Sequence, residues 1–233
     1  MFDNKRVIVT GGAGALGGAV VNYYESKGAF VAILDYSDEL LNASYPKKND
    51  NNCYLSCDLT NRSSCENGLR TAIKQLGGID ILCNIAGGFM MGEDVHKTSD
   101  QTWDFLFDLN ARSIMNAAST VVPSMLENNG GKIVNVAARA ANAGLAKMGP
   151  YIASKAAVAR LTESMAMELR EQNINVNCVM PGIIDTPRNR SDMPDADFSK
   201  WVTPSNLANV IGFLTSDDAI SVHGASIPVD GLS

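Results

Sequence analysis

Tyr151 and Lys155 stand four positions apart in the order Tyr-x-x-x-Lys. On a helix this spacing places the phenol and the ammonium group side by side on one face. An unperturbed tyrosine has a pKa of about 10 and is a weak acid–base group at neutral pH. A nearby ammonium favours the phenolate, so we expect Lys155 to lower the pKa of Tyr151 towards the range useful for proton transfer. Because this spacing also arises by chance, the pair predicts a catalytic site only together with other motifs.

A glycine-rich stretch near the start of the chain could hold the phosphates of a nucleotide. Its sequence is TGGAGALGG, from Thr10 to Gly18, and it lies between the apolar run KRVIVT and a helical pattern. Glycines let the backbone turn sharply and approach a pyrophosphate, whose charge the N-terminus of the next helix stabilises. For this stretch alone, a tight turn without a ligand is the alternative.

A carboxylate after the glycine stretch indicates which nucleotide would bind. The run AFVAILD ends on Asp35, which could accept hydrogen bonds from an adenosine ribose and would repel the 2′-phosphate of NADP. Neither Arg nor Lys occurs in the glycine stretch or directly after Asp35. The sequence therefore favours NAD, used as NADH, and leaves NADP possible. A cap at the strand end is the alternative for Asp35. Asp58, in CDLT, is expected near the adenine, and its alternative is the N-cap of the next helix.

Alternating short apolar runs and helical patterns predict the fold. The expected strands are KRVIVT, AFVAILD, CYLSCD, GIDILCNIAG, GGKIVNVA, INVNCVMPG and GASIPVD. The expected helices cover roughly 14–27, 60–76, 100–128, 150–172 and 203–216. Several strands are apolar on both faces, which is typical of a parallel sheet covered by helices on each side. We therefore predict an α/β fold: one Rossmann-type, doubly wound parallel sheet of about seven strands, in a single domain over residues 1–233. The aperiodic segment 183–202 would be a substrate loop.

The composition excludes several classes of function. The chain has 233 residues, 45% of them hydrophobic, and a formal net charge of −6, so nucleic acid and anionic membranes are poor partners. No apolar run approaches the roughly 18 residues of a membrane span. The five cysteines form no C-x-x-C pair, and KRVIVT begins almost at the first residue. We expect a cytoplasmic protein with reduced, mostly buried thiols, no metal site and a small-molecule substrate.

Over essentially its whole length the chain resembles the classical short-chain dehydrogenase/reductase family. Thr10-Gly11 with Gly17 is similar to its TGxxxGxG turn, with Ala15 at the middle glycine, and NIAG and PGIIDT are similar to two further family stretches. The resemblance implies that Tyr151, Lys155 and Asn110, in LNARS, form the catalytic group, with Asn110 holding a proton-relay water beside the lysine. It implies cofactor contacts from the following residues: Thr10, Gly11, Gly14, Ala15, Leu16, Gly17, Asp35, Tyr36, Asp58, Leu59, Asn84, Ala86, Gly87, Tyr151, Lys155, Pro181, Gly182, Ile184 and Thr186.

Ala138 departs from the family pattern at the chemistry. The family has a serine there, which donates a hydrogen bond to the substrate oxygen, and loss of such a donor typically costs on the order of 10²–10³ in rate. The dihydropteridine reductase branch lacks this serine, and GGAGALG, ARAA at 138–141 and DTPRNRSDMPDADFSKW resemble that branch. This implies NADH-dependent reduction of quinonoid 6,7-dihydropteridine, an activated acceptor, to tetrahydropteridine. The alternatives are a generic short-chain reductase of another activated carbonyl or quinone, or a non-catalytic NAD-binding dimer.

Other residues have less specific interpretations. Phe89, Met90 and Met91 could touch a flat heterocycle, but core or interface packing is favoured. Trp201 could line the substrate pocket or simply pack. Small residues on the Tyr151 helix (Ala153, Ala156, Ala157 and Ala159) would permit close helix packing. Because this helix commonly lies at a subunit interface in the family, we expect a homo-oligomer, either a dimer or a tetramer.

Overall fold

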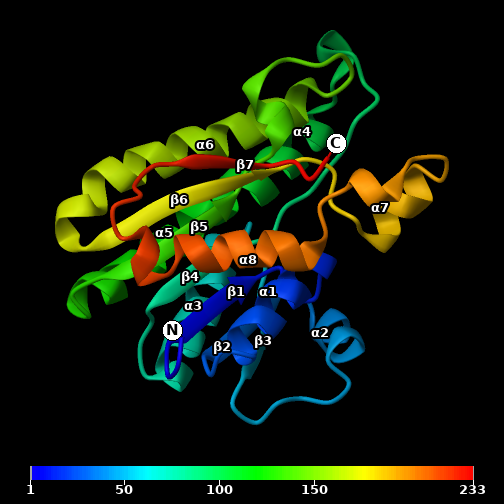
Figure 1. Cartoon of the computed structure of the whole chain (residues 1–233). Coiled ribbons are helices and arrows are strands. Elements are labelled where there is room, and N and C mark those ends of the chain that lie inside the picture. The colour runs from blue at the N-terminus through cyan, green and yellow to red at the C-terminus, as the bar shows by residue number, and fades with distance from the viewer. Residues whose placement is uncertain (1, 233) are drawn as a thin grey trace.

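A computed structural model describes residues 2–232 and places them around one seven-stranded parallel sheet (Figure 1). The strand order is β3-β2-β1-β4-β5-β6-β7. The strands are β1 (Arg6–Thr10), β2 (Phe30–Asp35), β3 (Cys53–Ser56), β4 (Ile81–Asn84), β5 (Gly131–Val136), β6 (Ile174–Pro181) and β7 (Ser226–Val229). The predicted fold class, a Rossmann-type doubly wound sheet, is confirmed.

Helices cover both faces of the sheet because successive strand residues point to opposite sides. In β1, Val7 and Val9 pack in the core beneath α1 and α8, whereas Ile8 packs in the core beneath α3 and α5. Every residue of β6 is buried. This arrangement explains the strands that are apolar on both faces, and it directs the carboxyl ends of all the strands to one edge of the sheet.

The helices lie close to the predicted ranges, with two additions and one interruption. They are α1 (Ala15–Glu25), α2 (Asp38–Ser44), α3 (Arg62–Leu76), α4 (Asp100–Phe107), α5 (Ser113–Glu127), α6 (Gly149–Leu169), α7 (Pro187–Asp192) and α8 (Pro204–Leu214). The sequence did not predict α2 or α7. The helix expected over 100–128 is present as continuous helical backbone from Asp100 to Glu127, but an unexpected π-helical turn at Asp108–Arg112 divides it into α4 and α5.

Side-chain caps fix several helix starts. Ser99 accepts a hydrogen bond from the backbone N–H of Thr102, and Thr203 accepts one from Asn206, where Pro204 opens α8. The alternative that placed Asp58 at the N-cap of α3 is wrong. Asn61 is the N-cap, and its side chain accepts from the N–H of Ser64.

The segment 183–202 is more ordered than its sequence suggested. It contains α7 and a 3₁₀ turn at Phe198–Lys200, and Ile184 forms a parallel β-bridge with Val202. The N–H of Leu232, near the end of the chain, donates to Lys200 at 2.8 Å. The segment therefore has internal structure and a connection to the C-terminal residues.

Two further properties bear on the sequence predictions. Within residues 2–232, no helix is both long and apolar enough to cross a membrane. All five cysteines, each inside the described part of the chain, are free thiols, and four of them are buried. The prediction that the thiols are mostly buried is confirmed, and their reduced state stays a prediction.

Candidate functional site

Backbone contacts that only glycine permits shape the turn between β1 and α1. Gly11 has a φ of 66°, in the left-handed region that glycine adopts readily. A Cβ on Gly17 would lie 2.0 Å from the carbonyl oxygen of Gly11. Gly14 caps α1 without a side-chain hydrogen bond. The first N–H groups of α1 therefore remain available to an anion, as a pyrophosphate site requires.

Asp35 joins the end of β2 to the glycine turn. One carboxylate oxygen accepts a hydrogen bond from the N–H of Ala13 at 2.9 Å, and the other accepts from the N–H of Tyr36 at 2.7 Å. The charge thus lies beside the turn, where a ribose would lie, and Tyr36 is exposed next to it. Asp35 also has the role of a strand-end cap, so the two interpretations of this residue are compatible.

Thr10 connects the ends of β1 and β4, a role that the sequence did not reveal. Its hydroxyl oxygen accepts from the N–H groups of Ile85 and Ala86, at 3.1 and 3.3 Å. Asn84 donates its side-chain amide to Asn135 at 2.9 Å inside the sheet. Gly87 follows at the carboxyl edge of β4.

Tyr151 and Lys155 lie in the first two turns of α6, as predicted. Lys155 is buried, and its Nζ donates to the carbonyl oxygen of Val136, at the end of β5, at 2.8 Å. A Cβ on Gly87 would lie 3.0 Å from the same nitrogen. Lys155 is thus placed between the carboxyl ends of β4 and β5, beside the segment that would meet a nicotinamide ribose.

The pKa values of this pair differ from the expectation. Burial raises the pKa of Tyr151 to about 12, the direction opposite to the expected lowering by Lys155, because loss of water around the phenol disfavours the phenolate. Burial lowers the pKa of Lys155 to about 8. At neutral pH the phenol is protonated and the amine is mostly charged.

Asn110 lies in the π-helical turn and binds two elements of the site. Its Oδ1 accepts from the N–H of Gly88 at 2.8 Å, and its Nδ2 donates to the carbonyl oxygen of Gly88 at 3.1 Å. Nδ2 also donates to the hydroxyl of Ser154 on α6 at 2.9 Å. π-Helical turns inside helices are frequent at functional sites. The structure places Asn110 next to Lys155, with its side chain already hydrogen-bonded.

Ala138 follows β5 in an extended conformation and is buried. The methyl group stands where the family's serine would place its hydroxyl. Arg139, the next residue, forms an ion pair with Asp230 at 3.0 Å. Directly after β5, residue 138 therefore offers a buried methyl group and no side-chain hydrogen-bond donor.

The other residues predicted to touch the cofactor lie along the same edge of the sheet. Gly182, after Pro181, donates its N–H to Val229 at 3.1 Å, and the Thr186 hydroxyl caps α7. Ile184 pairs with Val202. At the other side of the sheet, Asp58 accepts from both the N–H and the hydroxyl of Thr60, at 2.9 and 2.6 Å. Leu59 is buried and accepts from Asn116 at 2.8 Å.

The region facing a substrate contains aromatic and sulfur-containing side chains. Phe89 packs edge-on against Tyr151, with ring centroids 4.8 Å apart. Phe89, Met90 and Met91 are all exposed, so packing in the core is wrong, and packing at an interface stays a prediction. Trp201 is buried and packs against Phe198 at 4.8 Å.

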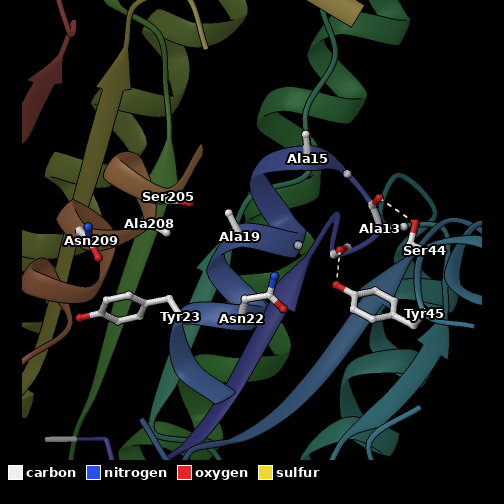
Figure 2. Close-up of a pocket in the computed structure, with 13 residues that line it drawn as sticks. Ala13, Ala15, Ala19, Asn22, Tyr23, Ser44, Tyr45, Ser205, Ala208 and Asn209 are labelled. Carbon is white, nitrogen blue, oxygen red and sulfur yellow. Dashed lines mark hydrogen bonds between the residues drawn. The ribbon is translucent and has the colours of Figure 1, made fainter. Parts of the chain in front are cut away.

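A hollow of about 700 Å³ borders the glycine turn, and Tyr151 is not among the residues that line it (Figure 2). Figure 2 shows Tyr23 and Tyr45 on either side of the exposed face of α1. The Tyr45 hydroxyl donates to Gly12 at 2.7 Å, and Ser44 donates to Ala13 at 3.0 Å. These two bonds support the turn from outside, and no sequence pattern indicated them. The hollow does not contain the catalytic candidates, so we place the chemistry at the carboxyl edge of the sheet.

The short chain dehydrogenase family matches residues 5–197 of the chain. This protein belongs to the short-chain dehydrogenases. A NAD-dependent glycerol dehydrogenase of Listeria innocua serovar 6a is 30% identical over 99% of this short-chain dehydrogenase and 94% of its own length. A cyclopentanol dehydrogenase of Comamonas testosteroni is 31% identical, covering 98% and 96%. The crystal structure of levodione reductase has a TM-score of 0.91 and 26% identity, covering 99% and 98%.

These likenesses identify the chain as a short-chain oxidoreductase, and the glycerol dehydrogenase that it resembles is NAD-dependent. The residues present fit such a dinucleotide: the turn cannot accept a Cβ at Gly17, α1 begins without a side-chain cap, and the Asp35 carboxylate lies beside the turn. The resemblance to the dihydropteridine reductase branch stays a prediction.

Proposed function

We propose that this short-chain dehydrogenase uses NADH to reduce an activated, conjugated acceptor, with quinonoid dihydropteridine as the favoured substrate. Ala138 carries this proposal, because it leaves a methyl group beside an otherwise complete Tyr151, Lys155 and Asn110 arrangement. A ketone needs a donor where negative charge develops on its oxygen. A quinonoid dihydropterin gains conjugation on reduction and needs less of that help.

The protonation of the site supports reduction. NADH supplies the hydride when it is bound. A phenol with a pKa of about 12 is protonated at neutral pH, so Tyr151 is ready to donate a proton to the acceptor. The ammonium of Lys155, held by Val136 one helical turn after Tyr151, would place a positive charge near the expected nicotinamide ribose. Asn110 supports the proton relay beside Lys155.

The main test compares three acceptors in NADH oxidation: quinonoid dihydropterin, cyclopentanone and a conjugated diketone. We expect the wild type to turn over the pterin fastest and Tyr151→Phe to lower kcat on the order of 10²–10⁴-fold. Ala138→Ser should raise cyclopentanone reduction by about tenfold or more and barely change pterin reduction.

Two other outcomes of this assay would favour alternative functions. Wild-type cyclopentanone reduction that equals or exceeds pterin reduction would overturn the proposal. It would favour a dehydrogenase of simple alcohols or ketones, a function consistent with the names of the glycerol and cyclopentanol relatives. NADH binding without turnover of any acceptor would identify a non-catalytic NAD-binding protein.

The preference for NADH over NADPH rests on Asp35. Asp35→Asn keeps an acceptor for the Ala13 N–H and removes the charge that would repel a 2′-phosphate. We expect the ratio of NADPH to NADH dissociation constants, measured by cofactor fluorescence, to fall about tenfold or more. Asp38→Asn, on the exposed start of α2, is the control and should leave the ratio unchanged. An unchanged ratio in Asp35→Asn would contradict the NAD assignment.

We also propose a homo-oligomer, a dimer or tetramer, that uses the outer faces of α5 and α6. Met115 on α5 and Met167 on α6 are both exposed and apolar. Exposed apolar side chains on a helix pair are typical of subunit contacts. The mass in solution, from light scattering, tests this.

A further inference from the structure

Ser154 lies between Tyr151 and Lys155 on α6, and its side chain is fully buried. Its hydroxyl accepts a hydrogen bond from Nδ2 of Asn110 at 2.9 Å and donates one to the carbonyl oxygen of Tyr151 at 2.8 Å. The hydroxyl proton therefore points into the helix, and an oxygen lone pair faces Asn110. The result is a directed chain from amide to hydroxyl to carbonyl.

The Asn110 amide has a single orientation that satisfies its neighbours. Its oxygen faces the N–H of Gly88, while its nitrogen faces the carbonyl of Gly88 and the hydroxyl of Ser154. A flipped amide would set its NH₂ group against the N–H of Gly88. Gly88 and Ser154 therefore select the same orientation from opposite sides.

This amide in turn holds the segment that covers Lys155. Gly87 lies close to both side chains: a Cβ on it would be 3.0 Å from Lys155 Nζ and 3.0 Å from Asn110 Oδ1. The position of Gly87 over the ammonium thus depends on the bonds between Asn110 and Gly88. Ser154 is the residue of α6 that fixes Asn110 through a side-chain hydroxyl.

We propose that Ser154 is a positioning residue that fixes the Asn110 amide and so holds the Gly87–Gly88 segment against Lys155. Its effect on turnover rests on the proposed function, but its effect on the segment does not. Ser154→Ala leaves one buried N–H of Asn110 without its acceptor, which loosens the grip on Gly88.

Thr162 provides a matched control on the same helix. Its hydroxyl is equally buried, accepts from Nδ2 of Asn135 at 2.9 Å and donates to Val158 at 2.8 Å. Thr162→Val breaks the same kind of chain two turns further along α6. It removes a buried hydroxyl without touching Asn110.

The first experiment measures hydrogen exchange of the Gly88 amide by NMR, with no acceptor present. We expect exchange in Ser154→Ala to be about tenfold faster than in the wild type. Thr162→Val should leave Gly88 unchanged. Wild-type exchange in Ser154→Ala, or equal acceleration in both variants, would overturn the proposal. This measurement decides the role of Ser154 even if the proposed function fails.

The second experiment measures kcat with NADH and quinonoid dihydropterin. We expect Ser154→Ala to lower kcat about 10- to 100-fold, while its melting temperature falls no more than that of Thr162→Val. In an Asn110→Ala background, Ser154→Ala should cause no further loss, because Ser154 acts through Asn110. Additive losses, or an equal fall of kcat in Thr162→Val, would show a merely structural role and overturn the proposal.

Discussion

At the glycine turn, backbone atoms approach one another so closely that a side chain at Gly17 would not fit, while the side chains of Asp35 and Tyr45 support the turn by hydrogen bonds. Gly12 donates its N–H to Leu34 at 3.0 Å, and Gly17 lies against the carbonyl of Gly11. The segment 183–202 combines the backbone bridge between Ile184 and Val202 with side-chain pairs. Arg190 donates to Asp185 at 2.8 Å, and its guanidinium lies 4.8 Å from the Phe198 ring centroid. The nucleotide side therefore requires glycine at a fixed position, whereas the substrate side is organised in part by pairs of side chains.

The 138–149 loop adds to this contrast. Lys147 has a φ of 66°, a left-handed conformation rare for residues with a side chain. Its carbonyl accepts the N–H of Gly92 at 2.9 Å, and its ammonium pairs with Asp94 at 2.6 Å. These contacts join two loops that flank Tyr151. On the substrate side, side-chain pairing thus coexists with a locally strained backbone.

The largest expected effect comes from replacing one glycine by alanine on the nucleotide side and one on the substrate side. In Gly17→Ala the Cβ meets backbone atoms that cannot move aside, so we expect the NADH dissociation constant to rise about 10- to 100-fold. In Gly144→Ala, in the 138–149 loop, a Cβ meets nothing within 4 Å, and we expect binding and turnover to be unchanged. Isothermal titration with NADH measures the affinity of both variants, and NADH oxidation measures their turnover. Normal NADH affinity in Gly17→Ala would break the comparison.

Lys155 lies where the two sides meet, and its pKa of about 8 predicts opposite pH trends for activity and stability. As pH rises through 8 the ammonium is lost, so kcat/KM should fall, approaching tenfold per unit. Between pH 8 and about 10.5 the unfolded chain binds more protons at this residue than the folded one, so its contribution to stability rises with pH. Activity assays and denaturant unfolding measure the two trends. Lys155→Met should lack this part of the rise in stability between pH 8 and about 10.5. If the variant shows the same rise as the wild type, Lys155 is not the group that causes it.

The sequence predicted what depends on local pattern. Alternating runs located the strands, and the glycine turn and the spacing of Tyr151 and Lys155 needed no tertiary information. The π-helical turn could not be predicted from the sequence, because residues 100–128 keep one helical pattern throughout. The pKa of Tyr151 depends on burial by elements distant in sequence, so spacing alone gave the wrong direction. The exposure of Phe89 depends likewise on how the loop after β4 packs.

The smallest expected effect lies in the segment 183–202, where two arginines allow a matched comparison. Arg190 binds Asp185 and lies over Phe198, whereas Arg188 forms only a 3.6 Å ion pair with Asp192, both of them exposed. Arg190→Gln should raise KM for the acceptor a few-fold, leave KM for NADH unchanged and lower Tm by no more than about 2 °C, because exposed ion pairs contribute little to global stability. Arg188→Gln should change none of these values.

If Arg190→Gln also raised KM for NADH, the two sides of the site would be coupled through this segment, and the division between them would be wrong. If instead both variants behaved like the wild type, the Asp185–Arg190–Phe198 cluster would not shape the substrate side. A selective change in the acceptor KM of Arg190→Gln alone would indicate that side-chain pairing organises this half of the site independently of the glycine turn. The substrate range of this short-chain dehydrogenase could then be altered within 183–202 without loss of the nucleotide site.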